Sequence, residues 1–176
     1  MNYMKKLLFV TVLLFTQLCW AQTEGDRGYR VKVGEQAPQL SFSLMDGTPV
    51  SNESLKGKVV LLQFTASWCG VCRKEMPQLE SEIWQRFKKN DFILLGIDLK
   101  EEPEKVKRFI EQTGISYPMA IDSDGSLFEI FTLPNAGVTR NIVIDKEGKI
   151  IFLSRLYERK EFEMMIEMID KELKKN

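Results

Sequence analysis

The sequence predicts an α/β fold in which a mixed β-sheet is flanked by helices on both faces, with a β-hairpin extension at the N-terminal end. An apolar, β-branched run at 58–64 has the composition of a strand covered on both sides. The segment after it repeats apolar residues every three or four positions, as a helix with one buried face does. Strands alternating with helices before a final hairpin and helix predict a sheet between two helical layers.

Residues 1–21 have the pattern of a secretory signal peptide. Lys5 and Lys6 give a positive start, an apolar stretch follows at 7–15, and Ala21 offers a small residue at the cleavage point. The apolar stretch is shorter than the roughly 20 residues of a membrane-spanning helix, so an uncleaved anchor is the lesser alternative. We therefore expect a periplasmic or secreted protein.

Cys19 opens a second alternative, a lipoprotein anchored through an acylated cysteine. We rank it below cleavage, because Leu18 is larger than the residue usually found before such a cysteine. Cleavage after residue 21 would remove Cys19 and leave Cys69 and Cys72 as the cysteines of the mature chain. No odd thiol would then face an oxidising compartment.

The rest of the chain reads as a flexible lead-in at 22–30, which is polar and contains glycine, and one domain at 31–176. A turn at Asp46-Gly47 predicts a hairpin near the start of the domain. Pro77 predicts a kink within a helix, and Pro103 suits the first turn of another helix. The acidic cluster at 101–104 is expected to be a solvated loop and helix start.

In chain order we expect a hairpin of strands at 40–44 and 48–50, a helical turn at 51–55, a strand at 58–64 and a helix from 69 to about 89. After these we expect a strand at 92–99, a helix from 103 to about 114, and a segment at 117–122 leading into a short helix at 126–131. Paired strands at 141–145 and 149–154 and an amphipathic helix at 160–174 complete the domain.

Cys69 and Cys72 stand where the central strand turns into a helix. The exposed N–H groups and positive dipole end of a helix N-terminus favour a thiolate at Cys69. Cys72 lies one turn further on, so its sulfur can attack a disulfide formed on Cys69. A zinc site needs about four ligands, and the chain has three cysteines and no histidine. A purely structural disulfide across so short a loop would restrain the unfolded chain little. The pair thus indicates redox chemistry, with Cys69 as nucleophile and Cys72 as resolving cysteine.

The run from Trp68 to Pro77, WCGVCRKEMP, resembles the W-C-x-x-C-x-x-E-x-P motif of the TlpA/ResA-like extracytoplasmic thiol-disulfide oxidoreductases, which belong to the thioredoxin superfamily. The runs at 33–38 and 142–150 are similar to that family's opening segment and late hairpin. The resemblance covers about residue 31 to the C-terminus. It implies a thioredoxin fold for the domain.

Glu75 lies one turn beyond Cys72, on roughly the same helix face. The resemblance implies a role for it beside the active site, where a carboxylate could accept the proton of Cys72 and raise thiol pKa values. The alternative is an ordinary acidic residue in the first turn of a helix, and both interpretations stay open. Thioredoxins proper place a buried aspartate six residues before the first cysteine, where this chain has Gln63.

The run Val138-Thr139-Arg140 occupies the loop that, in the resembling family, faces the cysteines and pairs with the substrate backbone. Thr139 stands where these proteins usually have a cis-proline. A cis bond before a residue other than proline costs about 3 kcal/mol, so we expect a trans bond. Arg140 would stabilise the Cys69 thiolate if it points to the site, or else be a solvated loop residue. Trp68 is expected both to pack and to offer a flat surface to the substrate peptide.

We therefore expect an extracytoplasmic thiol-disulfide oxidoreductase that reduces disulfides in secreted or periplasmic proteins. The Gly70-Val71 dipeptide brings no cation to the thiolate, whereas strong oxidants stabilise their reduced form. Reduction outside the cytoplasm requires a membrane thiol electron donor. We expect a monomer with no cofactor and no metal, its redox centre being the Cys69–Cys72 disulfide. Equal numbers of basic and acidic residues, 25 of each, do not favour nucleic acid as a partner.

Three other functions are alternatives to this prediction. One is a disulfide-forming oxidant, which would use the same cysteines in the opposite direction. Another is a thiol peroxidase of the peroxiredoxin kind, whose P-x-x-x-T-x-x-C motif would need proline and threonine where Leu62 and Ala66 stand. The third is a copper carrier, which the absence of histidine opposes.

Overall fold

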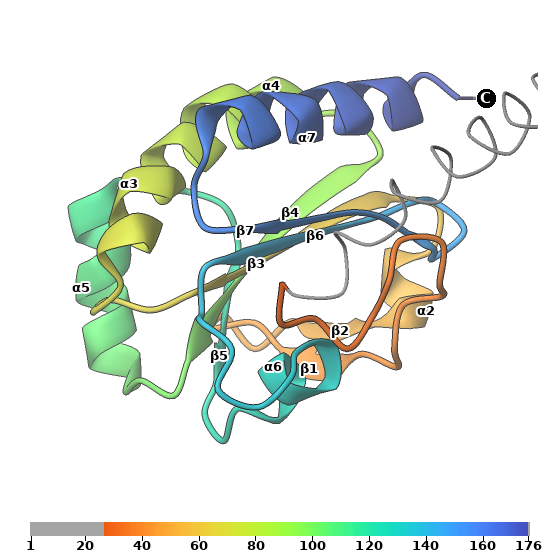
Figure 1. Ribbon diagram of the computed structural model, residues 1–176. Coiled ribbons are helices and arrows are strands. Elements are labelled where there is room, and N and C mark those ends of the chain that lie inside the picture. The colour runs from red at the N-terminus through yellow and green to blue at the C-terminus, as the bar shows by residue number, and fades with distance from the viewer. Residues whose placement is uncertain (1–26, 176) are drawn as a thin grey trace, which may run out of the picture.

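A computed structural model describes residues 27–175 of the chain. The predicted signal peptide and most of the predicted lead-in lie outside the described residues. A five-stranded mixed sheet, in the order β5-β4-β3-β6-β7, forms the centre, and a separate two-stranded hairpin packs on the domain (Figure 1). The predicted fold class is confirmed. No helix between residues 27 and 175 is long and apolar enough to cross a membrane.

The sheet is built around β3 (Val59–Thr65), in which all seven residues are buried. It pairs in parallel with β4 (Phe92–Leu99), and β4 pairs in parallel with β5 (Met119–Asp122). On the other side, β6 (Arg140–Ile144) runs antiparallel to β3, and β7 (Ile150–Arg155) continues the sheet antiparallel to β6. A strand with neighbours on both edges and layers on both faces is expected to be mostly apolar, and β3 is apolar except for the buried Gln63 and Thr65.

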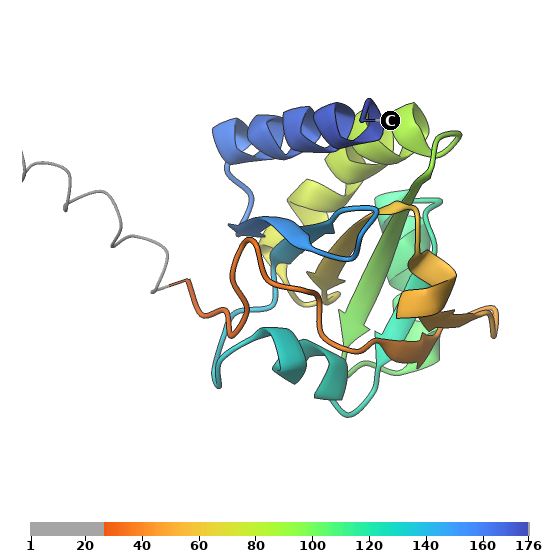
Figure 2. The same cartoon turned by 90° about the vertical axis from the view of Figure 1, so that its right-hand side faces the viewer.

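Helices cover both faces of this sheet, as Figures 1 and 2 show from two directions. The elements α3 (Gly70–Gln78), α4 (Gln85–Phe87) and α7 (Arg159–Leu173) lie on one face. On the opposite face lie α6 (Ser126–Phe131) and the hairpin of β1 and β2. The remaining elements are β1 (Ser41–Ser43), β2 (Pro49–Ser51), the short helix α2 (Asn52–Leu55) and α5 (Pro103–Thr113), which contacts α3.

The long helix predicted from residue 69 to 89 is interrupted. After α3 the chain forms a π-helical segment, η1 (Leu79–Trp84), and then the single turn of α4. Pro77 has no N–H to donate, and its ring crowds the carbonyl one turn earlier. The N–H of Leu79 contacts the carbonyls of both Glu75 and Met76. A kink was expected from the proline, but the wider π-helical turn was not.

The end of the predicted lead-in is held against the domain. Tyr29 forms an isolated bridge with Thr132, and its hydroxyl donates to the carbonyl of Ser154 at 2.5 Å. The N–H of Arg30 donates to the carbonyl of Phe131 at 2.8 Å. The prediction of a flexible lead-in is therefore wrong for residues 27–30, because their partners lie about a hundred positions away in the sequence.

Candidate active site

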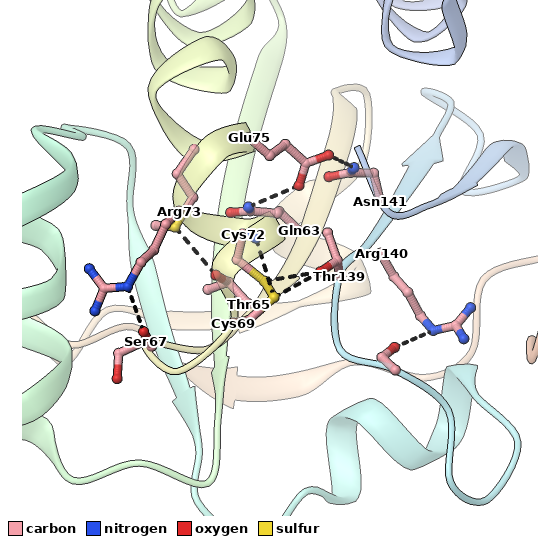
Figure 3. Close-up of a disulfide and its surroundings, with 12 residues drawn as sticks. Gln63, Thr65, Ser67, Cys69, Cys72, Arg73, Glu75, Thr139, Arg140 and Asn141 are labelled. Atoms are coloured by element: carbon pink, nitrogen blue, oxygen red, sulfur yellow. Dashed lines mark hydrogen bonds between the residues drawn. A yellow bond between two sulfur atoms is a disulfide. The ribbon is translucent and has the colours of Figure 1, made fainter. Parts of the chain in front are cut away.

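Cys69 and Cys72 form a disulfide at the junction of β3 and α3, with 5.3 Å between their Cα atoms (Figure 3). Cys69 is the N-cap of α3, in an extended backbone conformation, and its Sγ accepts a hydrogen bond from the N–H of Cys72 at 3.2 Å. Cys69 is 9 % exposed and Cys72 is fully buried. An incoming sulfur can therefore reach Cys69 and not Cys72. The helix-terminal setting predicted for the pair is present.

Thr139 lies directly against the disulfide. Its Oγ1 is 3.0 Å from Sγ of Cys69 and 3.2 Å from Sγ of Cys72, and the side chain is 3 % exposed. No cis peptide bond occurs in residues 27–175, so the bond before Thr139 is trans as predicted. Val138, the residue before it, is also buried. The structure thus brings the predicted loop to the cysteines, with a hydroxyl where the resembling family usually has a proline ring.

Arg140 does not reach the cysteines. Its side chain points away from the sulfurs (Figure 3). Its Nε donates to the carbonyl of Gly137 at 2.9 Å, and its Nη1 donates to the carbonyl of Arg27 at 2.6 Å. The guanidinium also lies 4.5 Å from the ring centroid of Tyr29. The residue is 1 % exposed, so it is neither a stabiliser of the Cys69 thiolate nor a solvated loop residue, the two roles predicted for it.

Glu75 is fully buried on α3, three residues beyond Cys72. Its carboxylate accepts hydrogen bonds from Nδ2 of Asn141 at 2.6 Å and from Nε2 of Gln63 at 3.4 Å. Burial raises the pKa of Glu75 to about 7, although these two hydrogen bonds act in the opposite direction. A buried carboxyl that titrates near neutral pH can exchange a proton with a thiol, so Glu75 is not an ordinary surface acid.

The partners of Glu75 come from the sheet. Gln63 on β3 pairs in register with Asn141 on β6, which places both amides on the face that α3 covers. The hydroxyl of Tyr117 donates to Oε1 of Gln63 at 2.9 Å and so fixes which end of that amide faces Glu75. Gln63 was noticeable in the sequence as a polar residue, whereas no role was predicted there for Asn141 or Tyr117. The one signal for Asn141 was a polar residue inside an apolar strand.

Trp68, next to Cys69, is 64 % exposed. An exposed indole beside the nucleophile offers the flat apolar surface predicted for substrate contact. It contributes less to internal packing than expected.

Two further buried carboxyl groups, which the sequence did not indicate, lie near the turn before Cys69, and one of them, Glu101, bonds to that turn. Glu101 accepts hydrogen bonds from the N–H of Ser67 at 2.5 Å and from its hydroxyl at 2.8 Å, and it pairs with Lys105. Glu101 is 8 % exposed, so the prediction of a solvated acidic loop is wrong for this residue. Asp98, on β4, is fully buried, and neither of its oxygens has a hydrogen-bond partner within the described residues. Burial and the neighbouring charge of Glu101 raise the pKa of Asp98 to about 7.

A group of acidic side chains that could together hold a metal ion occurs elsewhere in the described part of the chain. Asp145, Glu147 and Glu172 have carboxylate oxygens within 4.8 Å of one another. Asp145 directly follows β6, whereas Thr139 directly precedes it, so this group lies at the opposite end of the strand from the cysteines. Two of the three carboxylates have partners: Asp145 accepts a hydrogen bond from the N–H of Lys149, and Glu172 pairs with Lys175. The group has no connection to the redox pair.

Comparison with known proteins gives a consistent set of similarities. Residues 32–171 match the family model described as Redoxin. The chain is 29 % identical over 153 residues to "Thiol-disulfide oxidoreductase ResA" of Bacillus thuringiensis subsp. konkukian, covering 83 % of this chain and 86 % of that protein. It is 31 % identical over 122 residues to the protein of the same name in Bacillus anthracis, covering 69 % of each.

Solved structures give the same result. The chain superposes with a TM-score of 0.81 on a putative protein disulfide isomerase from Bacteroides thetaiotaomicron, at 50 % identity, covering 84 % of this chain and 94 % of that one. A putative thiol:disulfide interchange protein DsbE from Chlorobium tepidum gives a TM-score of 0.70 at 24 % identity, over 81 % of this chain and 99 % of that one. The second likeness is one of fold alone.

Proposed function

Because this chain belongs to the Redoxin family and is a thiol-disulfide oxidoreductase of the thioredoxin type, we propose that it reduces disulfides in proteins outside the cytoplasm. The resemblance to TlpA/ResA-like proteins is confirmed. Cys69 and Cys72 form its CxxC redox pair. The reducing direction, the compartment and the partners are the parts that we propose.

The buried carboxyl of Glu75 is the observation that carries the reducing direction. A carboxylate one helical turn from Cys72 opposes a second negative charge on the sulfurs, so it disfavours the thiolate. Within residues 27–175 the hydrogen-bond partners of this carboxylate are the neutral amides of Asn141 and Gln63, and no ion pair to it is formed there. A dithiol whose thiolate is poorly stabilised gives up its electrons more readily, which lowers the reduction potential of the couple.

The reaction proceeds in two exchange steps. The Cys69 thiolate attacks one sulfur of the substrate disulfide, forming a mixed disulfide and releasing the other substrate sulfur as a thiolate. Cys72 then loses its proton and attacks Sγ of Cys69, which closes the Cys69–Cys72 disulfide and releases the second substrate thiolate. The dithiol loses two electrons and the substrate gains them. Glu75, with a pKa of about 7, takes the proton of Cys72 in the second step.

The proposed location rests on the sequence. A positive start, a short apolar stretch and a small residue at position 21 have the pattern of a signal peptide. The motif resembles extracytoplasmic enzymes. In such a compartment the oxidised enzyme must be recycled, so we propose a membrane thiol protein as electron donor and proteins with accessible disulfides as substrates. The enzyme would act as a monomer with no cofactor beyond its own disulfide.

The reduction potential of the Cys69–Cys72 couple tests the proposal. The domain from residue 22 onward is equilibrated with defined dithiothreitol or glutathione ratios, and the reduced fraction is measured by thiol labelling. A potential near thioredoxin's, about −270 mV, supports a reductase. A potential near about −120 mV would make the protein an oxidant of its substrates. Hydrogen peroxide consumption by the same sample tests the peroxidase alternative, and a Cys69→Ser variant gives the background of both assays.

A further inference from the structure

The hydroxyl of Thr139 touches both reacting atoms of the redox pair. Its Oγ1 lies 3.0 Å from Sγ of Cys69 and 3.2 Å from Sγ of Cys72. Proline, the usual residue at this position in the resembling family, has no group that could make either contact. The contact is therefore a property of this chain's own residue.

Thr139 is held firmly in this position. Its carbonyl accepts a hydrogen bond from the N–H of Leu156 at 3.1 Å, and the next residue, Arg140, begins β6. The side chain is 3 % exposed, so water does not compete for the hydroxyl. A β-branched side chain also has few rotamers available. The hydroxyl is thus preorganised next to both sulfurs. In these buried surroundings a hydrogen bond is stronger than in water.

A threonine hydroxyl can serve both sulfurs at once, because it has one proton to donate and two lone pairs that accept. In the reduced protein one sulfur is a thiolate and the other a thiol. The thiolate is an acceptor only, and the thiol carries the proton. A hydroxyl between them can donate to the first and accept from the second without any change of position.

We propose that Thr139 is a catalytic residue whose hydroxyl donates a hydrogen bond to the Cys69 thiolate and accepts one from the Cys72 thiol. The proposal rests on the proposed thiol-disulfide exchange but holds for either direction of electron flow. It adds no co-reactant. When Cys69 attacks the substrate sulfur, its negative charge passes to the released substrate thiolate, and the Thr139 proton stays on Oγ1 throughout.

The surrounding charged groups do not provide an alternative donor. Within the described residues, the donors in contact with Sγ of Cys69 are the N–H of Cys72 and the Thr139 hydroxyl. Arg73 is engaged with the carbonyl of Ser67 and with Gln112, and Arg140 is directed away from the sulfurs. Glu75, on the same helix, is a carboxyl whose charge disfavours the thiolate. Thr139 therefore offsets part of the effect of Glu75.

Thr139→Val removes the hydroxyl while keeping the branched shape, and Thr139→Ser keeps the hydroxyl as the matched control. The reduced proteins are alkylated with iodoacetamide between pH 5 and pH 10, and modification of Cys69 is followed by mass spectrometry. We expect Thr139→Val to raise the pKa of Cys69 by about one unit and so to slow alkylation about tenfold below that pKa, as the loss of a hydrogen bond to a charged group does. Thr139→Ser should behave like the wild type.

If alkylation of Cys69 depends on pH in the same way in Thr139→Val and in the wild type, the proposal is overturned. It is also overturned if the valine and serine variants shift the pKa of Cys69 equally, because the shift would then come from changed packing. If the valine variant does not fold, as judged by circular dichroism, Thr139→Ala takes its place in the same comparison. Failure of the proposed function is separate, since it would appear as a wild-type reduction potential in the range of strong oxidants. Failure of the Thr139 proposal would appear in the alkylation profiles and leaves that potential as the test of direction.

Discussion

The side-chain amide of Asn141 donates a 2.6 Å hydrogen bond to the carboxylate of Glu75, and both side chains are fully buried. This contact joins β6 to the helix that carries the cysteines. Oδ1 of Asn141 has no hydrogen-bond partner within the described residues. When Glu75 gains a proton, a turn of the Asn141 amide would present that oxygen as the acceptor. The pair can therefore hold Glu75 in both protonation states, as a proton-exchanging group requires.

Glu75 should make the stability of the protein depend on pH. The pKa of Glu75 is raised from 4.5 to about 7 in the folded state by burial. Its favourable contribution is thus fully present below pH 4.5 and is lost as the pH rises through 7, a change on the order of 3 kcal/mol. We expect Glu75→Gln to remove this part of the pH dependence, measured by urea unfolding at pH 5 and pH 8. Glu111→Gln, at an exposed position on α5, is the control. A Glu75 variant with the wild-type pH dependence would contradict the assignment.

Asp98 should also make the folded protein less stable as the pH rises, in its case because a second carboxylate lies nearby. Its pKa is raised from 3.8 to about 7 by burial and by the charge of Glu101. Above pH 7 two neighbouring carboxylates would both be ionised, and the fold would lose stability as the pH rises. Asp98→Asn should therefore melt at a higher temperature than the wild type at pH 8 and near the wild-type temperature at pH 5, as followed by circular dichroism. Equal destabilisation at both pH values would show that the carboxyl has only a packing role.

The contact between Ser67 and Glu101 should support the reactivity of Cys69. Glu101 holds both the N–H and the hydroxyl of Ser67, two residues before the nucleophile. Ser67→Ala removes one of these bonds, which we expect to cost about 1 kcal/mol of unfolding free energy. Glu101→Gln weakens both and should slow substrate reduction severalfold. Both variants are measured by urea unfolding and by turnover of a disulfide substrate, with Glu104→Gln as the exposed control on the next helix. Unchanged turnover in Glu101→Gln would remove this supporting role.

The unequal exposure of the two sulfurs predicts different outcomes for the two cysteine variants. Cys69 is 9 % exposed and Cys72 fully buried, so the substrate bond must form on Cys69. Cys72→Ser should accumulate a mixed disulfide with a substrate protein, because nothing then resolves it. Cys69→Ser should form none. Non-reducing electrophoresis and mass spectrometry distinguish the two, and a mixed disulfide on Cys72 would reverse the assigned roles.

The sequence predicts those parts of the fold and site that depend on local pattern. The buried run of β3, the cysteines at the start of α3, and the position of Thr139 beside them follow from composition, spacing and resemblance. Other features depend on contacts between distant segments. Arg140 is fixed by residues 27–29 and Ser67 by Glu101, and no local pattern indicates either pairing. The π-helical turn follows Pro77, which lacks a backbone N–H. A helix can adjust to a missing N–H either by a kink or by a π-helical turn, and the sequence does not indicate which of the two forms.

The buried guanidinium of Arg140 has a mechanical consequence. It holds the carbonyl of Arg27 at one end and is bonded through its own backbone to Thr139 at the other. Tyr29 lies across the guanidinium and is bonded to β7. A pull on the chain at Arg27 would therefore be transmitted to the residue in contact with both sulfurs, within one side chain's length. A force applied to the domain through its N-terminal side would therefore act on the redox centre itself. A force applied at the end of α7 would act on a helix that lies on the opposite face of the sheet from α6.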